Sequence, residues 1–167
     1  MRRTYSLAAV PLLISLFIYL FYRSRSTVVN ELMAFIFSSG VYNQARRAVS
    51  YAIPLSEPVV FSLPGGLWVF CLTILSKDLY LKIGNTRIQV ALLPILFVIG
   101  LEFLQLIHFT NGTFDLWDIG FYLAFWSLGY LGLPSRDLQQ NVLSPFTLKG
   151  FLCLTCFLSV YLAHVNS

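Results

Sequence analysis

The chain has 167 residues, of which 57% are hydrophobic, 16% aromatic and only 11% charged. Average soluble domains carry roughly 25% charged residues, so this chain has less than half the usual supply of surface charge. Disorder is excluded as well, because disordered chains combine low hydrophobicity with high charge. The net charge of +4 does not indicate a nucleic-acid partner, since the Lys and Arg residues lie in short clusters between apolar runs. The composition predicts a single-domain integral membrane protein.

Five apolar runs set the expected architecture. A helix needs about 20 mostly apolar residues to cross the roughly 30 Å hydrocarbon core of a bilayer. The runs cover residues 4–22, 59–76, 88–107, 116–133 and 146–164. We therefore expect an all-α fold, a polytopic transmembrane helix bundle of about five spans that forms one domain over residues 1–167.

The basic residues predict an orientation for these spans, because Lys and Arg are more frequent in cytoplasmic loops. One side of a five-span chain would carry seven of them: Arg2, Arg3, Lys77, Lys82, Arg87, Arg136 and Lys149. The other side would carry four: Arg23, Arg25, Arg46 and Arg47. The count predicts an N-terminus inside and a C-terminus outside. The first run exceeds the roughly 7–15 apolar residues of a signal-peptide core, which indicates an uncleaved signal anchor.

The only long connection covers residues 26–58. Its apolar patch, residues 32–37, is too short to span a bilayer and predicts an interfacial or re-entrant helix. Pro64 then interrupts the start of the second run, so that a kinked or delayed helix entry is expected. The three cysteines lie inside apolar runs, where they are expected as small buried hydrophobes rather than as a disulfide framework.

Ionisable side chains inside apolar runs are costly and point to function. They concentrate at the end of the third run and the start of the fourth. At about 100° per residue, Glu102, Gln105 and His108 fall within an arc of roughly 120° on one helix face. These three residues predict a polar stripe that reaches the outer end of that helix.

The fourth run continues this polar region after the turn signal Asn111-Gly112. Asp115 and Asp118 lie one turn apart at the expected start of the fourth helix, and Tyr122 falls near them on the helical wheel. A short turn makes the third and fourth helices antiparallel neighbours, so their acidic faces are expected to meet in one outward-facing pocket. The opposite face carries small residues suited to close helix packing: Gly120, Ala124 and Ser127.

Each acidic or polar residue also has a structural interpretation. Asp115 and Asp118 could cap the fourth helix, since Asp favours the N-cap and complements the helix dipole in the first turn. Glu102 and Gln105 could be hydrogen-bond partners between helices, and His108 could be a solvated residue at a helix end. Among the carboxylates, Glu102 is expected to be placed deepest and to have the most raised pKa.

Arg46 and Arg47 are expected as outer-surface charges, with pairing to the acidic residues or binding of a phosphate as alternatives. The candidate binding residues are therefore Glu102, Gln105, His108, Asp115, Asp118, Tyr122, Arg46 and Arg47. No cofactor is expected unless it is a divalent cation, for which oxygen ligands are suited and for which the candidate ligands are Glu102, Asp115 and Asp118.

The same stretch resembles the VanZ-like family of small bacterial membrane proteins. The matching pattern pairs an acidic residue with a glutamine three positions later and adds a Gly-Thr-Phe-Asp-x-x-Asp turn, here Glu102, Gln105, Gly112, Thr113, Phe114, Asp115 and Asp118. Residues 63–68, Leu-Pro-Gly-Gly-Leu-Trp, are similar to the family's entry to the preceding helix. The resemblance covers residues 60–132. It implies a multi-pass protein of the bacterial cytoplasmic membrane that is linked with resistance to glycopeptide antibiotics such as teicoplanin.

Three functions follow as hypotheses. The first is a non-enzymatic envelope protein whose acidic pocket binds or shields a cell-wall lipid precursor or a glycopeptide, or docks a homo-oligomeric or membrane partner. The second is a metal-dependent enzyme acting on a lipid-linked or phosphorylated headgroup, with Arg46 or Arg47 at the phosphate. The third is a transporter or channel subunit with the acidic residues as a proton relay. A binding role is favoured over catalysis because the sequence has no nucleophile–base signature, phosphate loop or zinc motif.

Overall fold

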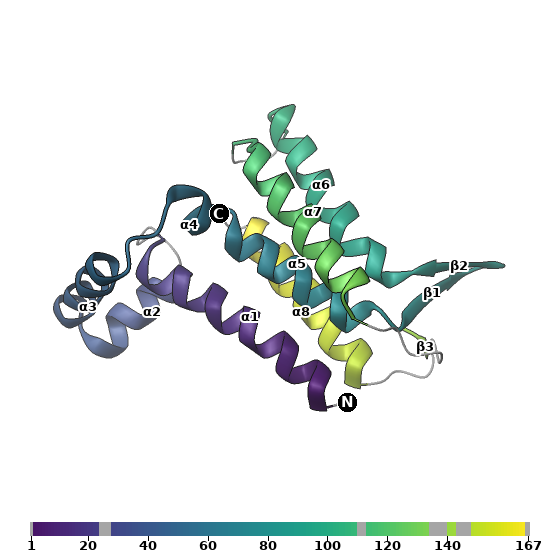
Figure 1. The fold of residues 1–167 in the computed structure, drawn as a ribbon, viewed down its shortest axis with the longest axis horizontal. Coiled ribbons are helices and arrows are strands. Elements are labelled where there is room, and N and C mark those ends of the chain that lie inside the picture. The colour runs from purple at the N-terminus through teal and green to yellow at the C-terminus, as the bar shows by residue number, and fades with distance from the viewer. Residues whose placement is uncertain (1, 24–27, 110–112, 134–139, 143–147, 166–167) are drawn as a thin grey trace.

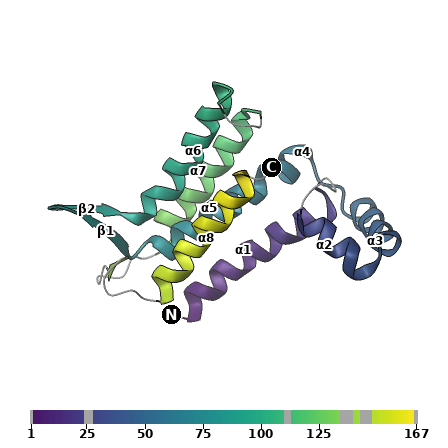
Figure 2. The same ribbon diagram turned by 180° about the vertical axis from the view of Figure 1, so that it is seen from behind.

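The computed structural model describes residues 2–23, 28–109, 113–133, 140–142 and 148–165. Its helices are α1 (Arg2–Phe21), α2 (Val28–Phe37), α3 (Ser39–Ala52), α4 (Glu57–Phe61), α5 (Leu63–Ser76), η1 (Val90–Leu92), α6 (Leu93–Leu106), α7 (Leu116–Leu131) and α8 (Leu148–Val165). Its strands are β1 (Leu79–Ile83), β2 (Thr86–Gln89) and β3 (Gln140–Asn141). In Figures 1 and 2, α1 and α8 run alongside α5, while α6 and α7 form a pair. Helices α2 and α3 lie at one end of the molecule, and the β1–β2 hairpin lies at the other.

The expected transmembrane bundle is not what the structure shows. Within the described residues, no helix combines the length and the apolarity that crossing a bilayer requires. Helices α5 and α6 have 14 residues each and α7 has 16, which corresponds to about 21–24 Å against a roughly 30 Å core. Pro64 and Pro94 stand in the first turns of α5 and α6, so that both helices begin inside the apolar runs. The prediction of an all-α bundle of about five membrane spans is therefore wrong, although helices do form at all five apolar runs.

A small sheet was also not predicted. It has the strand order β2-β1-β3, with β1 antiparallel to β2 and parallel to β3. Gly84 has a φ of 60° in the two-residue turn between β1 and β2, a conformation that glycine adopts without steric cost. Leu79 of β1 is buried in a cluster with Val90, Val142 and Cys153, so the sheet closes this end of the helical core.

Helix α5 forms the centre of the core. Ten of its 14 residues are buried, and α1, α6, α7 and α8 all contact it. Cys71 of α5 lies against α1, where its thiol donates a hydrogen bond of 2.9 Å to the carbonyl of Ala8. The buried hydroxyls of Thr73 and Ser76 donate to carbonyls of their own helix at 2.7 and 2.6 Å, so that α5 carries polar side chains into the core without unpaired donors.

The contact between α5 and α7 depends on glycines of α5. A Cβ on Gly66 would lie 2.7 Å from Phe125 Cδ2 and 3.2 Å from Phe121 Cβ of α7. The small residues of α7 that were expected to pack do not fill this role. Gly120 and Ala124 are exposed, and nothing lies within 4 Å of a Cβ built on Gly120. For Gly120 and Ala124 the expectation is wrong, because α7 contributes large aromatic side chains to this interface and α5 provides the space for them.

Helices α2 and α3 form a helical hairpin in the connection that precedes α4. The turn between them is at Ser38, which has a φ of 63°. The hydroxyl of Tyr42 in α3 donates to Asn30 Oδ1 of α2 at 2.7 Å and lies 2.6 Å from the carbonyl oxygen of Leu20 in α1. These bonds fix the hairpin against the C-terminal end of α1. The apolar patch over residues 32–37 is thus helical, and Phe35 remains largely exposed.

The glycine-dependent contact can be tested by adding one methyl group. Gly66→Ala is expected to lower the free energy of unfolding by about 1–3 kcal/mol, because the new Cβ overlaps Phe125 and the backbone of α7. Gly120→Ala is the matched control, and it is expected to be neutral or to raise stability by up to about 1 kcal/mol, since its Cβ meets open space. Urea unfolding followed by circular dichroism measures both changes. A Gly66→Ala variant as stable as the unsubstituted protein would contradict the described packing.

Candidate functional site

Three carboxylates meet where the C-terminal end of α6 faces the N-terminus of α7. Glu102 is buried at 4% exposure, and its Oε2 accepts a hydrogen bond of 3.4 Å from the backbone N–H of Asp115. Asp115 is the N-cap of α7, with its Oδ1 accepting from the N–H of Trp117 at 2.9 Å. The capping interpretation of Asp115 is therefore confirmed. Asp118 lies in the first turn of α7 and is half-buried. We call Glu102, Asp115 and Asp118 the carboxylate cluster.

The pKa values of this cluster reflect burial and mutual repulsion. Burial, together with the charges of Asp118 and Asp115, raises the pKa of Glu102 from 4.5 to about 7, although the bond from the Asp115 N–H opposes this. Burial also raises the pKa of Asp118, and nearby Ser62 and Arg23 act in the opposite direction. The expectation that Glu102 is placed deepest is confirmed. Near neutral pH, Glu102 is divided between its charged and its protonated form.

Tyr122 and Ser62 complete the surroundings of the carboxylate cluster. The ring of Tyr122 packs on Gly65 of α5, where an added Cβ would lie only 2.7 Å from Tyr122 Cε1. Burial and the charges of Asp118 and Glu102 raise the pKa of the Tyr122 phenol. Ser62, at the junction of α4 and α5, is 1% exposed, and its Oγ forms no hydrogen bond of normal geometry within the described residues. It is nevertheless near enough to the Asp118 carboxylate to lower the pKa of that group.

Arg23, just after α1, provides positive charge beside the cluster. Its guanidinium donates to the carbonyl of Phe61 at 2.8 Å. It also lies over the rings of Tyr19 and Phe61, with 5.1 Å to each ring centroid. Its charge lowers the pKa values of Asp118 and Tyr122. Neither Arg23 nor Ser62 is predicted from the sequence as a site residue, because their proximity to the carboxylates depends on how α1 and α4 pack and no local pattern encodes it.

The other predicted residues of the polar stripe, Gln105 and His108, lie at the C-terminal end of α6. The backbone N–H of His108 donates to the carbonyl of Gln105 at 2.9 Å, and its Nδ1 lies 3.3 Å from the same oxygen. His108 has a φ of 57° and is exposed, while Gln105 is half-buried. The hydrogen bond between His108 and Gln105 closes the C-terminal end of α6. The exposed position of His108 agrees with its interpretation as a solvated residue at a helix end. Residues Asn111 and Gly112 of the expected turn, and Arg25, lie outside the described residues.

The suggested divalent-cation site has no counterpart in the part of the chain that the structure describes. There, no group of three or more His, Cys, Asp and Glu side chains is arranged to hold a metal ion. Glu102, Asp115 and Asp118 are neighbours, but they do not present their oxygens as one ligand set. The three cysteines form no disulfide bond within the described residues, and Cys71 and Cys153 are buried while Cys156 is partly buried.

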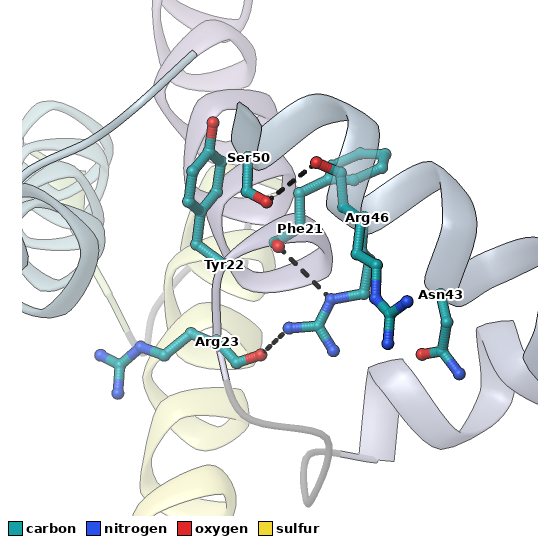
Figure 3. A pocket seen from close by; sticks show the side chains of 7 residues that line it. Phe21, Tyr22, Arg23, Asn43, Arg46 and Ser50 are labelled. Atoms are coloured by element: carbon teal, nitrogen blue, oxygen red, sulfur yellow. Dashed lines mark hydrogen bonds between the residues drawn. The ribbon is translucent and has the colours of Figure 1, made fainter. Parts of the chain in front are cut away.

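A second candidate site is a cleft of about 360 Å³ between the C-terminal end of α1 and helix α3. Figure 3 shows its lining, which consists of Phe21, Tyr22, Arg23, Asn43, Arg46, Arg47 and Ser50. We call this the arginine cleft. Arg46 and Arg47 therefore lie here and do not line the carboxylate cluster. The positions 43, 46, 47 and 50 recur at helical spacing, which places them on one face of α3 and is the sequence signal that could have revealed the cleft.

The carbonyl groups at the end of α1 fix Arg46 in the arginine cleft. Its Nε donates to the carbonyl of Phe21 at 3.3 Å, and its Nη2 donates to the carbonyl of Arg23. Arg23 thus contributes its backbone oxygen to the cleft, while its side chain extends away from Arg46 (Figure 3). The guanidinium of Arg47 forms no hydrogen bond or ion pair with the side chains that the structure describes, and the Arg47 carbonyl accepts from Ser50 Oγ at 3.2 Å.

Comparison with known proteins finds no matching family model, no matching curated protein and no matching solved structure. The expected association with antibiotic resistance and with the bacterial envelope depended on the VanZ-like resemblance and on the predicted spans. No comparison supports the first, and none of the described helices is suited to cross a bilayer. The prediction of a transmembrane antibiotic-resistance protein is corrected accordingly.

The raised pKa of Glu102 gives a pH-dependent stability with a defined sign. Between pH 4.5 and about 7 the unfolded chain has lost the Glu102 proton while the folded protein retains it, so the free energy of unfolding falls as pH rises through this window. The full shift corresponds to at most about 3 kcal/mol, since one pKa unit is about 1.4 kcal/mol. Glu102→Gln is expected to remove this contribution to the pH dependence of the free energy of unfolding. The variant is also expected to be more stable than the unsubstituted protein at pH 8.

Chemical unfolding at several pH values between 4 and 8 measures this effect. Glu57→Gln is the control, because Glu57 is an exposed acid at the start of α4. If the free energy of unfolding depended on pH identically in Glu102→Gln and in the unsubstituted protein, this would contradict the burial of Glu102 and its repulsion by the neighbouring carboxylates.

Proposed function

We propose that the protein binds an anionic ligand in the arginine cleft and that a phosphate group is the moiety it recognises. The observation that carries the proposal is the composition of the lining, which includes the side chains of Arg46 and Arg47 and no acidic residue. Positive charge that converges on a cleft without a described counter-ion favours a negatively charged occupant. This develops one of the alternatives that the sequence left open for Arg46 and Arg47.

The size of the cleft supports a small ligand. Its volume of about 360 Å³ lies at the lower end of the range of roughly 300–1,000 Å³ that is usual for ligand pockets. Phe21 and Tyr22 give it an apolar side, while Asn43 and Ser50 contribute polar groups on α3. A phosphate monoester with a short organic group matches both kinds of lining.

The two arginines of α3 have complementary roles in this proposal. Arg46 is oriented by the carbonyls of Phe21 and Arg23, which engage Nε and Nη2 and leave Nη1 for a ligand. Arg47 has all its N–H donors available, because no described side chain pairs with its guanidinium. A guanidinium presents its donors in a planar fork that matches two phosphate oxygens, so Arg47 is suited to a bidentate contact.

The expected outcome is measurable binding of inorganic phosphate and of glycerol 3-phosphate by isothermal titration calorimetry. Arg47→Gln is expected to weaken the dissociation constant of glycerol 3-phosphate about tenfold or more, equal to about 1.4 kcal/mol, because it removes a charge-assisted contact. Binding is also expected to weaken as salt is added, since the cleft is open to solvent and its charges are screened.

Arg87→Gln is the matched control, because Arg87 is an exposed arginine on β2, at the other end of the molecule from α3 (Figure 1). Equal affinities for phosphate and acetate would contradict phosphate recognition. Equal loss of affinity in Arg47→Gln and Arg87→Gln would show binding by net charge alone, and it would contradict the assignment to the cleft.

A further inference from the structure

We propose that the carboxylate cluster is a second binding site, whose ligand is a primary ammonium group held between Glu102, Asp118 and the hydroxyl of Ser62. This site is separate from the arginine cleft in its lining and opposite to it in charge. The proposal does not depend on the proposed binding of phosphate.

The carboxylate cluster has an excess of negative charge. Three carboxylates, Glu102, Asp115 and Asp118, face one cation, Arg23, among the charged groups described around them. The guanidinium of Arg23 donates to the Phe61 carbonyl through Nη2 and lies over two aromatic rings, while its buried Nε has no hydrogen-bond partner among the described residues. Burial, together with repulsion by Asp118 and Asp115, raises the pKa of Glu102 to about 7. A bound cation would offset this repulsion.

Hydrogen-bond acceptors in the carboxylate cluster and at Ser62 remain available to a ligand. The Oγ of Ser62 is buried and has no hydrogen bond of normal geometry, and it faces Asp118. Glu102 uses Oε2 for the Asp115 N–H, which leaves Oε1. A buried polar oxygen without a partner costs free energy, so a ligand that donates to it gains affinity. A primary ammonium has three N–H donors, one for each of Glu102, Asp118 and Ser62.

The exposure of the cluster and the arrangement of its oxygens favour an ammonium over a metal ion. Asp115, Asp118 and Tyr122 are half-buried, so the cluster reaches the surface while Glu102 forms its deep end. A divalent metal would need several oxygens arranged around one point, and the described residues hold no such group. An ammonium tolerates a looser arrangement and can lie against the ring of Tyr122.

The titratable and charged groups that face this site come from several elements. Asp115, Asp118 and Tyr122 belong to α7, Tyr19 belongs to α1, and Arg23 follows α1. Ionised Glu102 is the form that attracts a cation. Affinity for an ammonium is therefore expected to increase as pH rises from 6 to 8, a range over which ethylammonium itself stays charged.

The test is a titration of the ¹⁵N-labelled full chain with ethylammonium chloride, followed by ¹H–¹⁵N NMR at constant ionic strength. We expect saturable shifts of the Asp115, Asp118 and Tyr122 amides. Asp118→Asn is expected to weaken binding at least tenfold. Glu102→Gln is expected to weaken it and to abolish its dependence on pH, and Ser62→Ala is expected to weaken it severalfold. Glu57→Gln, an exposed acid, is expected to leave it unchanged. The spectrum of each variant without ligand verifies its fold.

Three outcomes would overturn the proposal. Equal binding of tetramethylammonium, which has the charge but no N–H donors, would show unspecific attraction. Tighter saturable binding of Mg²⁺ or Ca²⁺ through the same residues would identify a metal site instead. An absence of saturable shifts at 50 mM ethylammonium in the unsubstituted protein would exclude the site. Because the phosphate titration uses other residues and another probe, either proposal can fail without the other.

Discussion

The structure depends on one constraint, which is that α5 must be buried on all sides and still carry polar groups. Its hydroxyl side chains satisfy themselves within the helix, as Thr73 does through the Val69 carbonyl. Its glycines let aromatic residues of α7 approach the backbone, and the thiol of Cys71 bonds to α1. Both candidate sites are built on elements that α5 fixes directly or through α1, so their geometry is a consequence of this packing.

Arg23 connects the two candidate sites. Its carbonyl oxygen orients Arg46 in the arginine cleft, whereas its guanidinium lies beside Asp118 and Tyr122. One residue thus separates a basic surface from an acidic one. This separation explains why the arginines of α3 do not neutralise the carboxylates: the end of α1 lies between them and supplies carbonyl groups as their partners. Backbone carbonyl oxygens, rather than carboxylate side chains, accept the hydrogen bonds of Arg46 and Arg23. Each site therefore retains its own charge.

The sequence predicted the positions of the principal helices and offered the N-cap as one of two interpretations of Asp115, because apolar runs and capping residues are local signals. Prediction from the sequence failed where the outcome depends on the length of a helix or on contacts between residues far apart in the chain. The delayed helix entry at Pro64 is expected from the sequence and is confirmed, whereas the late start of α6 at Pro94 is not predicted, because hydropathy alone does not register it. The Gly84-Asn85 pair between Ile83 and Thr86 is a hairpin signal, and it lies between two of the expected membrane spans, where no strand was predicted. Ser62 and Arg23 could not be found at all, because 38 residues separate Arg23 from its partner Phe61.

The central place of α5 also bears on how the chain reaches its native state. The helix is flanked by α1, which precedes it by about forty residues, and by α7 and α8, which follow much later in the sequence. Contacts between segments so far apart require large loops to close before they stabilise anything, and this slows folding. During synthesis from the N-terminus, α5 emerges with only α1 and the α2–α3 hairpin to cover it. Its most apolar surfaces stay open until α7 and α8 are made, so the half-finished chain is the species most exposed to aggregation and to capture by chaperones.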